Sequence, residues 1–113
     1  MVRQAQKEAE RGRVREAERL FHQALDADPR SAEAMIGLSD LAFERSAYAS
    51  ALKYARAASK IAPKSGAYRL RLGDAYFKTM RYTQAREHYE AAAALGEPLA
   101  RSRLAKLDEQ VGR

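Results

Sequence analysis

The sequence predicts an all-α protein, an α-solenoid of antiparallel helix pairs stacked side by side. Three observations support this prediction. Residues of the same type recur every 34 positions along most of the chain. Segments with apolar residues at helical spacing alternate with short turns. Three prolines and six glycines among 113 residues are too few for a turn-rich β protein.

The 34-residue period is the strongest of these signals, because repeats of 20–50 residues are typical of solenoids. A small residue occupies the same register position in all three units, at Ala17, Ala51 and Ala85. Pairs one period apart include Leu38 with Leu72, Asp40 with Asp74, Phe43 with Phe77, Tyr48 with Tyr82, Pro29 with Pro63, and the series Ala24, Ala58 and Ala92. Small residues at these steps would let two helix axes approach closely.

The helices follow in order from this period. The first unit covers residues 1–31, and its first helix is expected over residues 1–10. The second unit covers residues 32–65, with helices over 32–45 and 48–61 joined at Ser46 and Ala47. Apolar side chains recur at helical spacing in both of these helices.

The boundary of the second unit is marked by Pro63, which ends one helix, and by Ser65, which can cap the next. The third unit covers residues 66–97. Residues 98–113 form a last helix whose apolar stripe is Ala100, Leu104, Leu107 and Val111. Pro98 suits the first turn of that helix, and the helix would shield the exposed face of the third unit.

These residues resemble the tetratricopeptide repeat family. The third unit matches its pattern at Leu72-Gly73, Tyr76, Tyr82, Ala85, Tyr89 and Ala92, and the second at Leu38-Ser39, Tyr48, Ala51, Ala58 and Pro63. The first unit matches in its second half, at Gly12, Ala17, Phe21, Ala24 and Pro29. Its first helix diverges, since Gln4 and Glu8 stand where the family has Leu and Tyr, and Ser46 and Met80 replace the usual turn glycine.

The resemblance implies one domain, a right-handed superhelix of about seven helices. It also implies a concave face lined by the first helix of each unit. By register these helices supply Val2, Gln6, Ala9 and Ala67 together with the predicted partner-binding residues Glu33, Ile36, Asp40, Phe43, Glu44, Leu70, Arg71, Asp74, Phe77 and Lys78. Such modules serve as scaffolds or adaptors, and short arrays are often parts of bacterial regulators, secretion factors or motility factors.

The chemistry of this set predicts the partner. Ile36, Leu70, Phe43 and Phe77 would form two apolar rungs, and Asp40 and Asp74 an acidic ladder. A groove of this kind suits an extended or helical segment of a protein with apolar anchors and a Lys or Arg nearby. The alternatives are that both phenylalanines are core between units, and that the aspartates are solvated or paired with arginines.

One subfamily of these repeats holds the acidic C-terminal tails of heat-shock chaperones in a clamp of Lys, Asn and Arg. The corresponding positions here are Val2, Gln6, Gly37, Ala67 and Arg71. Only Arg71 matches, so the sequence argues against a chaperone-tail adaptor.

Other classes of function find less support. The only histidines, His22 and His88, lie 66 residues apart without a carboxylate–nucleophile constellation, so no enzyme, cofactor or small-molecule substrate is expected. The chain has no cysteine, no apolar run of ~20 residues for membrane insertion, and a charged start without a signal-peptide core. The simplest location is the cytoplasm, unless a targeting segment has been removed.

Three further alternatives stay open. The net charge of +6 includes a basic group at Arg11, Arg13, Arg15 and Arg19 and another at Lys53, Arg56, Lys60 and Lys64, which could contact nucleic acid. Acidic residues interleave the first group, so a solvated charged face is the usual explanation and nucleic acid is not expected. The last helix could instead pack on a second copy and form a homodimer. The domain could also be a structural unit that assembles with its own copies into a homo-oligomer, for which the less well closed amino-terminal end is the expected contact.

Overall fold

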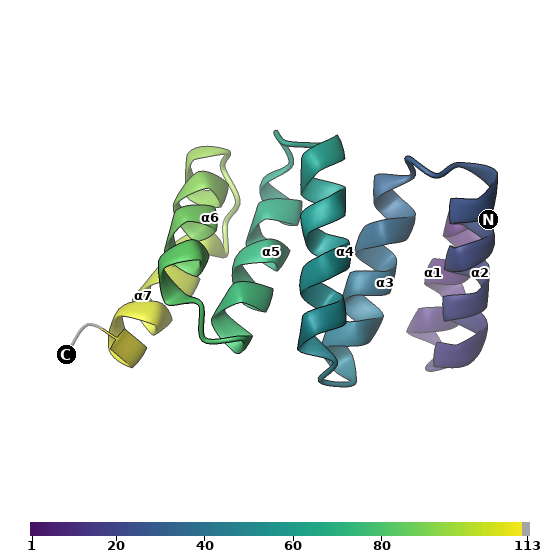
Figure 1. The fold of residues 1–113 in the computed structure, drawn as a ribbon, viewed down its shortest axis with the longest axis horizontal. Helices are drawn as coiled ribbons and strands as arrows, with labels where there is room; N and C mark the ends of the chain where they lie inside the picture. Colours follow the sequence, from purple (N-terminus) through teal and green to yellow (C-terminus); the bar gives the residue numbers. More distant parts are fainter. Residues whose placement is uncertain (112–113) are drawn as a thin grey trace.

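The computed structural model describes residues 1–111 and confirms the all-α solenoid: over these residues the chain forms seven helices and no strand. Each helix packs chiefly on the helices before and after it in the sequence, which gives a row 44 × 26 × 21 Å in extent (Figure 1). The helices are α1 (Val2–Glu10), α2 (Val14–Ala27), α3 (Ala32–Glu44), α4 (Tyr48–Ile61), α5 (Gly66–Lys78), α6 (Tyr82–Ala94) and α7 (Ala100–Val111).

The turn between the two helices of each pair has the same backbone conformation in all three pairs. Gly12, Ser46 and Met80 stand 34 residues apart, and their φ angles are 77°, 64° and 62°. This left-handed conformation lets the next N–H bond back into the helix, as in Ala47 N to Ala42 O at 2.8 Å. Ser46 and Met80 adopt it although they carry the Cβ that glycine lacks.

Helix starts and close helix approaches follow the sequence prediction. The Ser65 hydroxyl accepts from the Tyr68 N–H at 3.2 Å, and Ser31 caps α3 in the same way. Ala17, Ala51 and Ala85 are fully buried. At Gly73 the approach is closer still, because a Cβ there would lie 2.6 Å from Cδ1 of the buried Tyr89 ring.

Helix α1 forms despite its divergence from the family pattern. Glu8, where the family has an aromatic residue, is only 8% exposed, and its carboxylate lies 3.1 Å from Arg13 and 3.6 Å from Arg11. Ala5 packs with Phe21 and Leu38 in a first core cluster. An ion pair to the following turn therefore replaces the aromatic contact that the family pattern would supply.

The last helix differs in detail from its prediction. It begins at Ala100, and Pro98 lies in a preceding turn closed by Ala100 N to Glu97 O at 3.2 Å. Ala100 and Leu107 are fully buried and Leu104 is half-buried, but Val111 is 44% exposed. Residues 112–113 of the predicted helix lie outside the described residues. Within residues 1–111, no helix is both long and apolar enough to cross a bilayer.

The concave groove as candidate functional site

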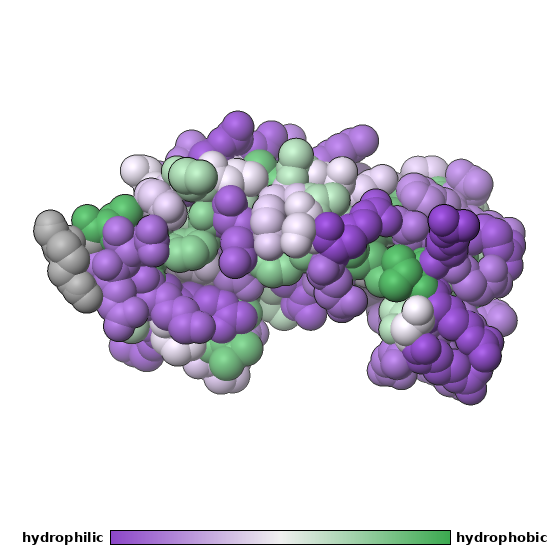
Figure 2. All heavy atoms as spheres, turned by 90° about the horizontal axis from the view of Figure 1, so that it is seen from below, coloured by the Kyte–Doolittle hydropathy of each residue, from purple (hydrophilic) through white to green (hydrophobic). Residues whose placement is uncertain are grey.

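Three connected hollows run along one side of the helix row, and together they make what we call the concave groove. The central hollow, of about 390 Å³, lies between α3, α5 and the start of α7. It shares Asp40, Glu44 and Arg71 with a hollow of about 370 Å³ that reaches α1. It shares Phe43, Asp74 and Arg103 with one of about 220 Å³ that reaches Lys106. Figure 2 shows the molecule hollowed along the lower edge of the view.

The apolar part of the groove is narrower than predicted. Ile36 and Leu70 are only 8% and 5% exposed, because both pack in the core cluster that includes Tyr89 and Leu107. Both line the groove floor but offer little surface, so most of the apolar surface that a ligand could contact there belongs to Phe43 and Phe77.

Phe43 and Phe77 remain half-buried in the wall of the groove. Phe43 packs edge to face on Tyr48, with ring centroids 5.2 Å apart, and Phe77 does the same on Tyr82 at 5.5 Å. Because each ring is braced by a tyrosine of the following helix, it would lose little freedom on contact with a ligand.

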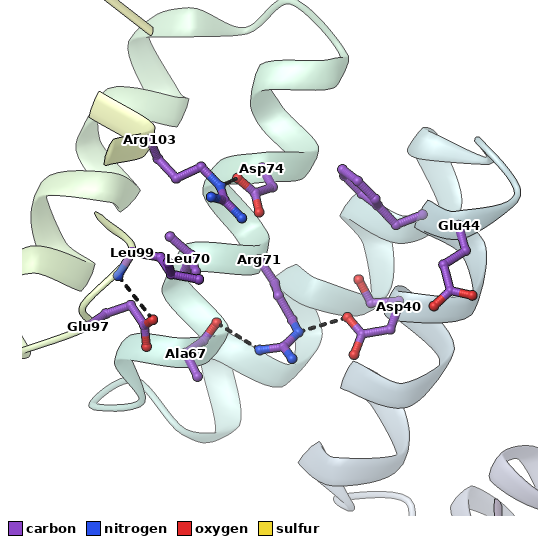
Figure 3. A pocket seen from close by; sticks show the side chains of 11 residues that line it. Asp40, Glu44, Ala67, Leu70, Arg71, Asp74, Glu97, Leu99 and Arg103 are labelled. Carbon is purple, nitrogen blue, oxygen red and sulfur yellow. Dashed lines mark hydrogen bonds and ion pairs between the residues drawn. The ribbon is translucent and has the colours of Figure 1, made fainter. Parts of the chain in front are cut away.

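Each of the two aspartates is paired with an arginine, which is the alternative to an acidic ladder that the sequence left open. Asp40 Oδ1 accepts from Arg71 Nε at 2.7 Å, and Arg71 also donates to the Ala67 carbonyl (Figure 3). Partial burial raises the pKa of Asp40 above its usual value, and the Arg71 charge opposes that rise. An arginine thus neutralises the carboxylate in the middle of the groove.

Asp74 is neutralised by a residue that the repeat pattern did not predict. Its Oδ1 accepts from Arg103 Nε of α7 at 2.9 Å (Figure 3). The same oxygen accepts from the Tyr89 hydroxyl at 2.5 Å. Burial and this hydrogen bond strongly raise the pKa of the Tyr89 phenol. These two hydrogen bonds to Asp74 connect α5 with α6 and α7 at the end of the groove.

Several groove residues were missed because they lie outside the 34-residue period. Glu97 and Leu99 belong to the α6–α7 connection, and Arg103 and Lys106 to α7. The alternation of apolar and charged residues along 98–113 indicated a helix, but not how that helix is turned relative to the groove.

Five charged residues of the groove have no ion-pair partner within residues 1–111: Glu10, Glu44, Glu97, Lys78 and Lys106. Glu10 and Glu44 line the hollow between α1 and α3. Lys78 and Lys106 line the hollow at α5 and α7, and Lys78 Nζ lies 5.7 Å from the Tyr48 ring centroid. Glu33 stands apart, in a hollow that shares only Gln6 with the groove. The groove is therefore acidic at the α1 end and basic at the end with Lys78 and Lys106, where Phe77 also lies. Phe43 lines both the central hollow and the basic end, and Glu97 adds a carboxylate to the central hollow.

The two histidines lie on the second helices of their pairs, and neither lines the groove. His22 of α2 is exposed, whereas His88 of α6 is half-buried and stacks on Tyr76 with centroids 5.4 Å apart. In the part of the chain that the structure describes, no three His, Asp or Glu side chains gather closely enough to hold a metal ion.

Comparisons with known proteins agree with this architecture. A family model described as a tetratricopeptide repeat matches residues 2–66 and 55–100. None of the curated proteins matches the chain in sequence.

Among solved structures, the first TPR of Spaghetti (RPAP3) bound to the HSP90 peptide SRMEEVD is similar at a TM-score of 0.92 and 20% identity, over 98% of this chain and 90% of that one. The Sgt2 TPR domain from Aspergillus fumigatus is similar at 0.89 and 21%, over 96% and 75%. The crystal structure of MamA is similar at 0.87 and 21% over 96% of this chain, which spans only 64% of the MamA chain.

Proposed function

The chain belongs to the tetratricopeptide repeat family, and from that premise we propose that it is a scaffold or adaptor whose concave groove binds a segment of a partner protein. This family is generally made of protein-interaction modules rather than enzymes. The observation that carries the proposal is the pair Phe43 and Phe77, half-buried and braced on one groove. Aromatic side chains are the usual anchors of such interfaces.

The charges of the groove favour a particular ligand. A peptide or helical segment would place apolar side chains against Phe43 and Phe77 and a Lys or Arg near Glu44, which has no ion-pair partner in residues 1–111. Electrostatic complementarity of this kind fixes the direction in which a ligand lies more than it adds affinity.

An acidic chaperone tail is not proposed, although a similar structure holds such a peptide. Four of the five clamp positions carry Val2, Gln6, Gly37 and Ala67, which supply no cation. The fifth, Arg71, is already paired with Asp40 at 2.7 Å. A chain-terminal carboxylate would therefore have to displace an existing ion pair.

The test is a selection of peptides from a random displayed library on the wild-type chain, followed by calorimetric titration of the selected peptides. We expect sequences with two apolar residues and a Lys or Arg. The Phe77→Ala variant should bind them about 5- to 30-fold more weakly, which corresponds to about 1–2 kcal/mol for an aromatic anchor.

Met80→Ala is the matched control, because Met80 is an apolar side chain that is 74% exposed and lies outside the groove. Its affinity should equal that of the wild type, and thermal melting should show both variants folded. Equal binding by wild type and by the Phe43→Ala/Phe77→Ala variant would refute the groove as the binding site.

A further inference from the structure

The positive charge of this chain is concentrated in one stretch. Residues 45–73 contain seven Arg or Lys and no Asp or Glu, whereas the other 84 residues carry 14 Arg or Lys against 15 Asp or Glu. The net charge of +6 therefore arises entirely within α4, the turn after it and the first half of α5.

Two of these seven cations are neutralised in the structure. Arg45 pairs with Glu18, and Arg71 pairs with Asp40 in the groove. The other five make no ion pair with any residue of the described chain, and we call them the basic face: Lys53, Arg56, Lys60, Lys64 and Arg69. None of the five lines the concave groove.

The geometry places the three α4 members on one side of their helix. Lys53, Arg56 and Lys60 are spaced three and four residues apart and are all exposed. Lys64 is also exposed in the following turn, and Arg69 Nε donates to the Pro63 carbonyl of that turn at 3.3 Å. The basic face thus runs along α4 and across its junction with α5.

The two arginines of the basic face are held in place by aromatic side chains. Arg56 donates to the Tyr76 hydroxyl at 3.0 Å, and Tyr76 stacks on His88 at 5.4 Å with an interplanar angle of 11°. His88 Nδ1 in turn lies 3.2 Å from an Arg69 guanidinium nitrogen. Both guanidinium groups are therefore partly ordered before any ligand arrives, which lowers the entropy that binding must overcome.

The charges around His88 agree with this arrangement. Burial lowers the pKa of His88 below its usual value, and the nearby Arg69 and Arg56 lower it further, against a smaller opposing effect of Glu87. A positive charge on His88 is thus disfavoured, first by burial and then by the two neighbouring arginines.

We propose that the basic face is a second binding surface of this chain, and that its ligand is an acidic segment of a partner protein whose Asp and Glu carboxylates pair with Arg56, Arg69 and the flanking lysines. Guanidinium groups bind carboxylates through two parallel hydrogen bonds, and both arginines retain unused N–H donors. The α4 cations extend about 11 Å along the helix, from Lys53 to Lys60. An extended segment of about three to four residues covers that length, and Lys64 and Arg69 continue the basic face beyond the end of α4.

Nucleic acid and lipid fit the basic face less well. Single-stranded nucleic acid stacks its bases on exposed aromatic rings, but Tyr76 is buried and already stacked, and Tyr54 is half-buried. A lipid surface takes up apolar side chains beside the cations. The exposed large apolar residues are Met1, Met80, Leu95, Leu99 and Val111, none of which lies in residues 45–73.

The test is fluorescence anisotropy with the full chain and three labelled probes: octaglutamate, octalysine and an eight-nucleotide oligothymidylate. Octaglutamate should bind in 50 mM salt, octalysine should not, and the oligothymidylate should bind more weakly than octaglutamate. The Arg56→Gln/Arg69→Gln variant should lose at least tenfold in affinity for octaglutamate.

The control is Arg15→Gln/Arg101→Gln, which removes the same charge from two exposed arginines elsewhere that make no ion pair with residues 1–111. It should change the affinity less than twofold. Equal loss in both variants, no octaglutamate binding at millimolar concentration, or tighter binding of the oligothymidylate would each overturn the proposal. The Phe43→Ala/Phe77→Ala variant should bind octaglutamate normally, so the two surfaces can fail independently.

Discussion

Replacing Gly73 by alanine should destabilise this chain, although alanine is the better helix former. The added Cβ would lie 2.6 Å from Cδ1 and 2.7 Å from Cε1 of Tyr89. Carbon atoms in contact normally stand about 3.5–4.0 Å apart, so the ring would have to move by about 1 Å. Tyr89 is only 1% exposed and its hydroxyl is bonded to Asp74, so the ring cannot move outward freely.

The magnitude follows from two opposing contributions. Overpacking of a tight core typically costs about 1–3 kcal/mol, and a helical glycine exchanged for alanine gains back up to about 1 kcal/mol. Because the Tyr89 ring is held in place, the cost should lie in the upper part of that range, at about 2–3 kcal/mol, so the net loss should be about 1–2 kcal/mol. With an unfolding entropy of about 2.1 cal/mol/K per residue, this lowers the melting temperature of a chain this size by about 4–8 °C.

The assay is urea unfolding of four proteins: wild type, Gly73→Ala, Tyr89→Ala and the double variant. In the Tyr89→Ala background the obstructing ring is gone, so Gly73→Ala should become stabilising by up to about 1 kcal/mol. The change in the free energy of unfolding caused by Gly73→Ala therefore has opposite signs in the two backgrounds. A Gly73→Ala effect of the same sign and size in both would refute the close approach as its cause.

Three further outcomes can be measured by denaturation or nuclear magnetic resonance. Tyr89→Phe should lower the free energy of unfolding by about 1–3 kcal/mol, because it removes a hydrogen bond to the Asp74 carboxylate; an unchanged urea midpoint would contradict this. Leu107→Ala should cost about 2–5 kcal/mol, since this fully buried side chain packs α7 on the core, and a loss below 1 kcal/mol would mean that α7 is dispensable. The pKa of His88, followed by its ring proton shifts, should lie below the usual 6.5 and rise in Arg69→Gln. Because the unfolded chain then binds a proton at higher pH than the folded chain does, His88 should lower the free energy of unfolding as pH falls from 6.5 through the folded pKa. This pH dependence should be weaker in His88→Gln, and a stability that rises over the same pH range relative to His88→Gln would contradict the lowered pKa.

The course of the backbone was predictable from the sequence because each 34-residue unit has the same pattern of turn, capping and small buried residues. Gly12, Ser46 and Met80 fall on one register position and share one left-handed conformation. Ser65 caps α5 as its position indicated. Each of these features depends on residues that are close together in the sequence. Because the same residue pattern recurs every 34 positions, each unit supports the assignment made for the others.

The directions of the side chains were less predictable. Ile36 and Leu70 belong to the helices that line the groove, but successive residues of a helix differ in direction by about 100°. A shift of one position along the helix therefore turns a side chain from the groove into the core. The partners of the aspartates lie 31 and 29 residues away, at Arg71 and Arg103. Neither separation equals the 34-residue period, so the repeat pattern contains no signal for these pairs.

Helix α7 combines two roles that a repeat array could keep separate. Leu107 shields the third helix pair, while Arg103 and Lys106 supply cations to the end of the concave groove. Exchanging α7 for a fourth helix pair would still bury the apolar surface, but it would release Asp74 from Arg103. Because Arg71 of α5 neutralises Asp40 of the preceding pair, an added pair would have to carry an arginine at the matching position to neutralise Asp74. The number of repeats and the charge of the groove are therefore not independent in this chain.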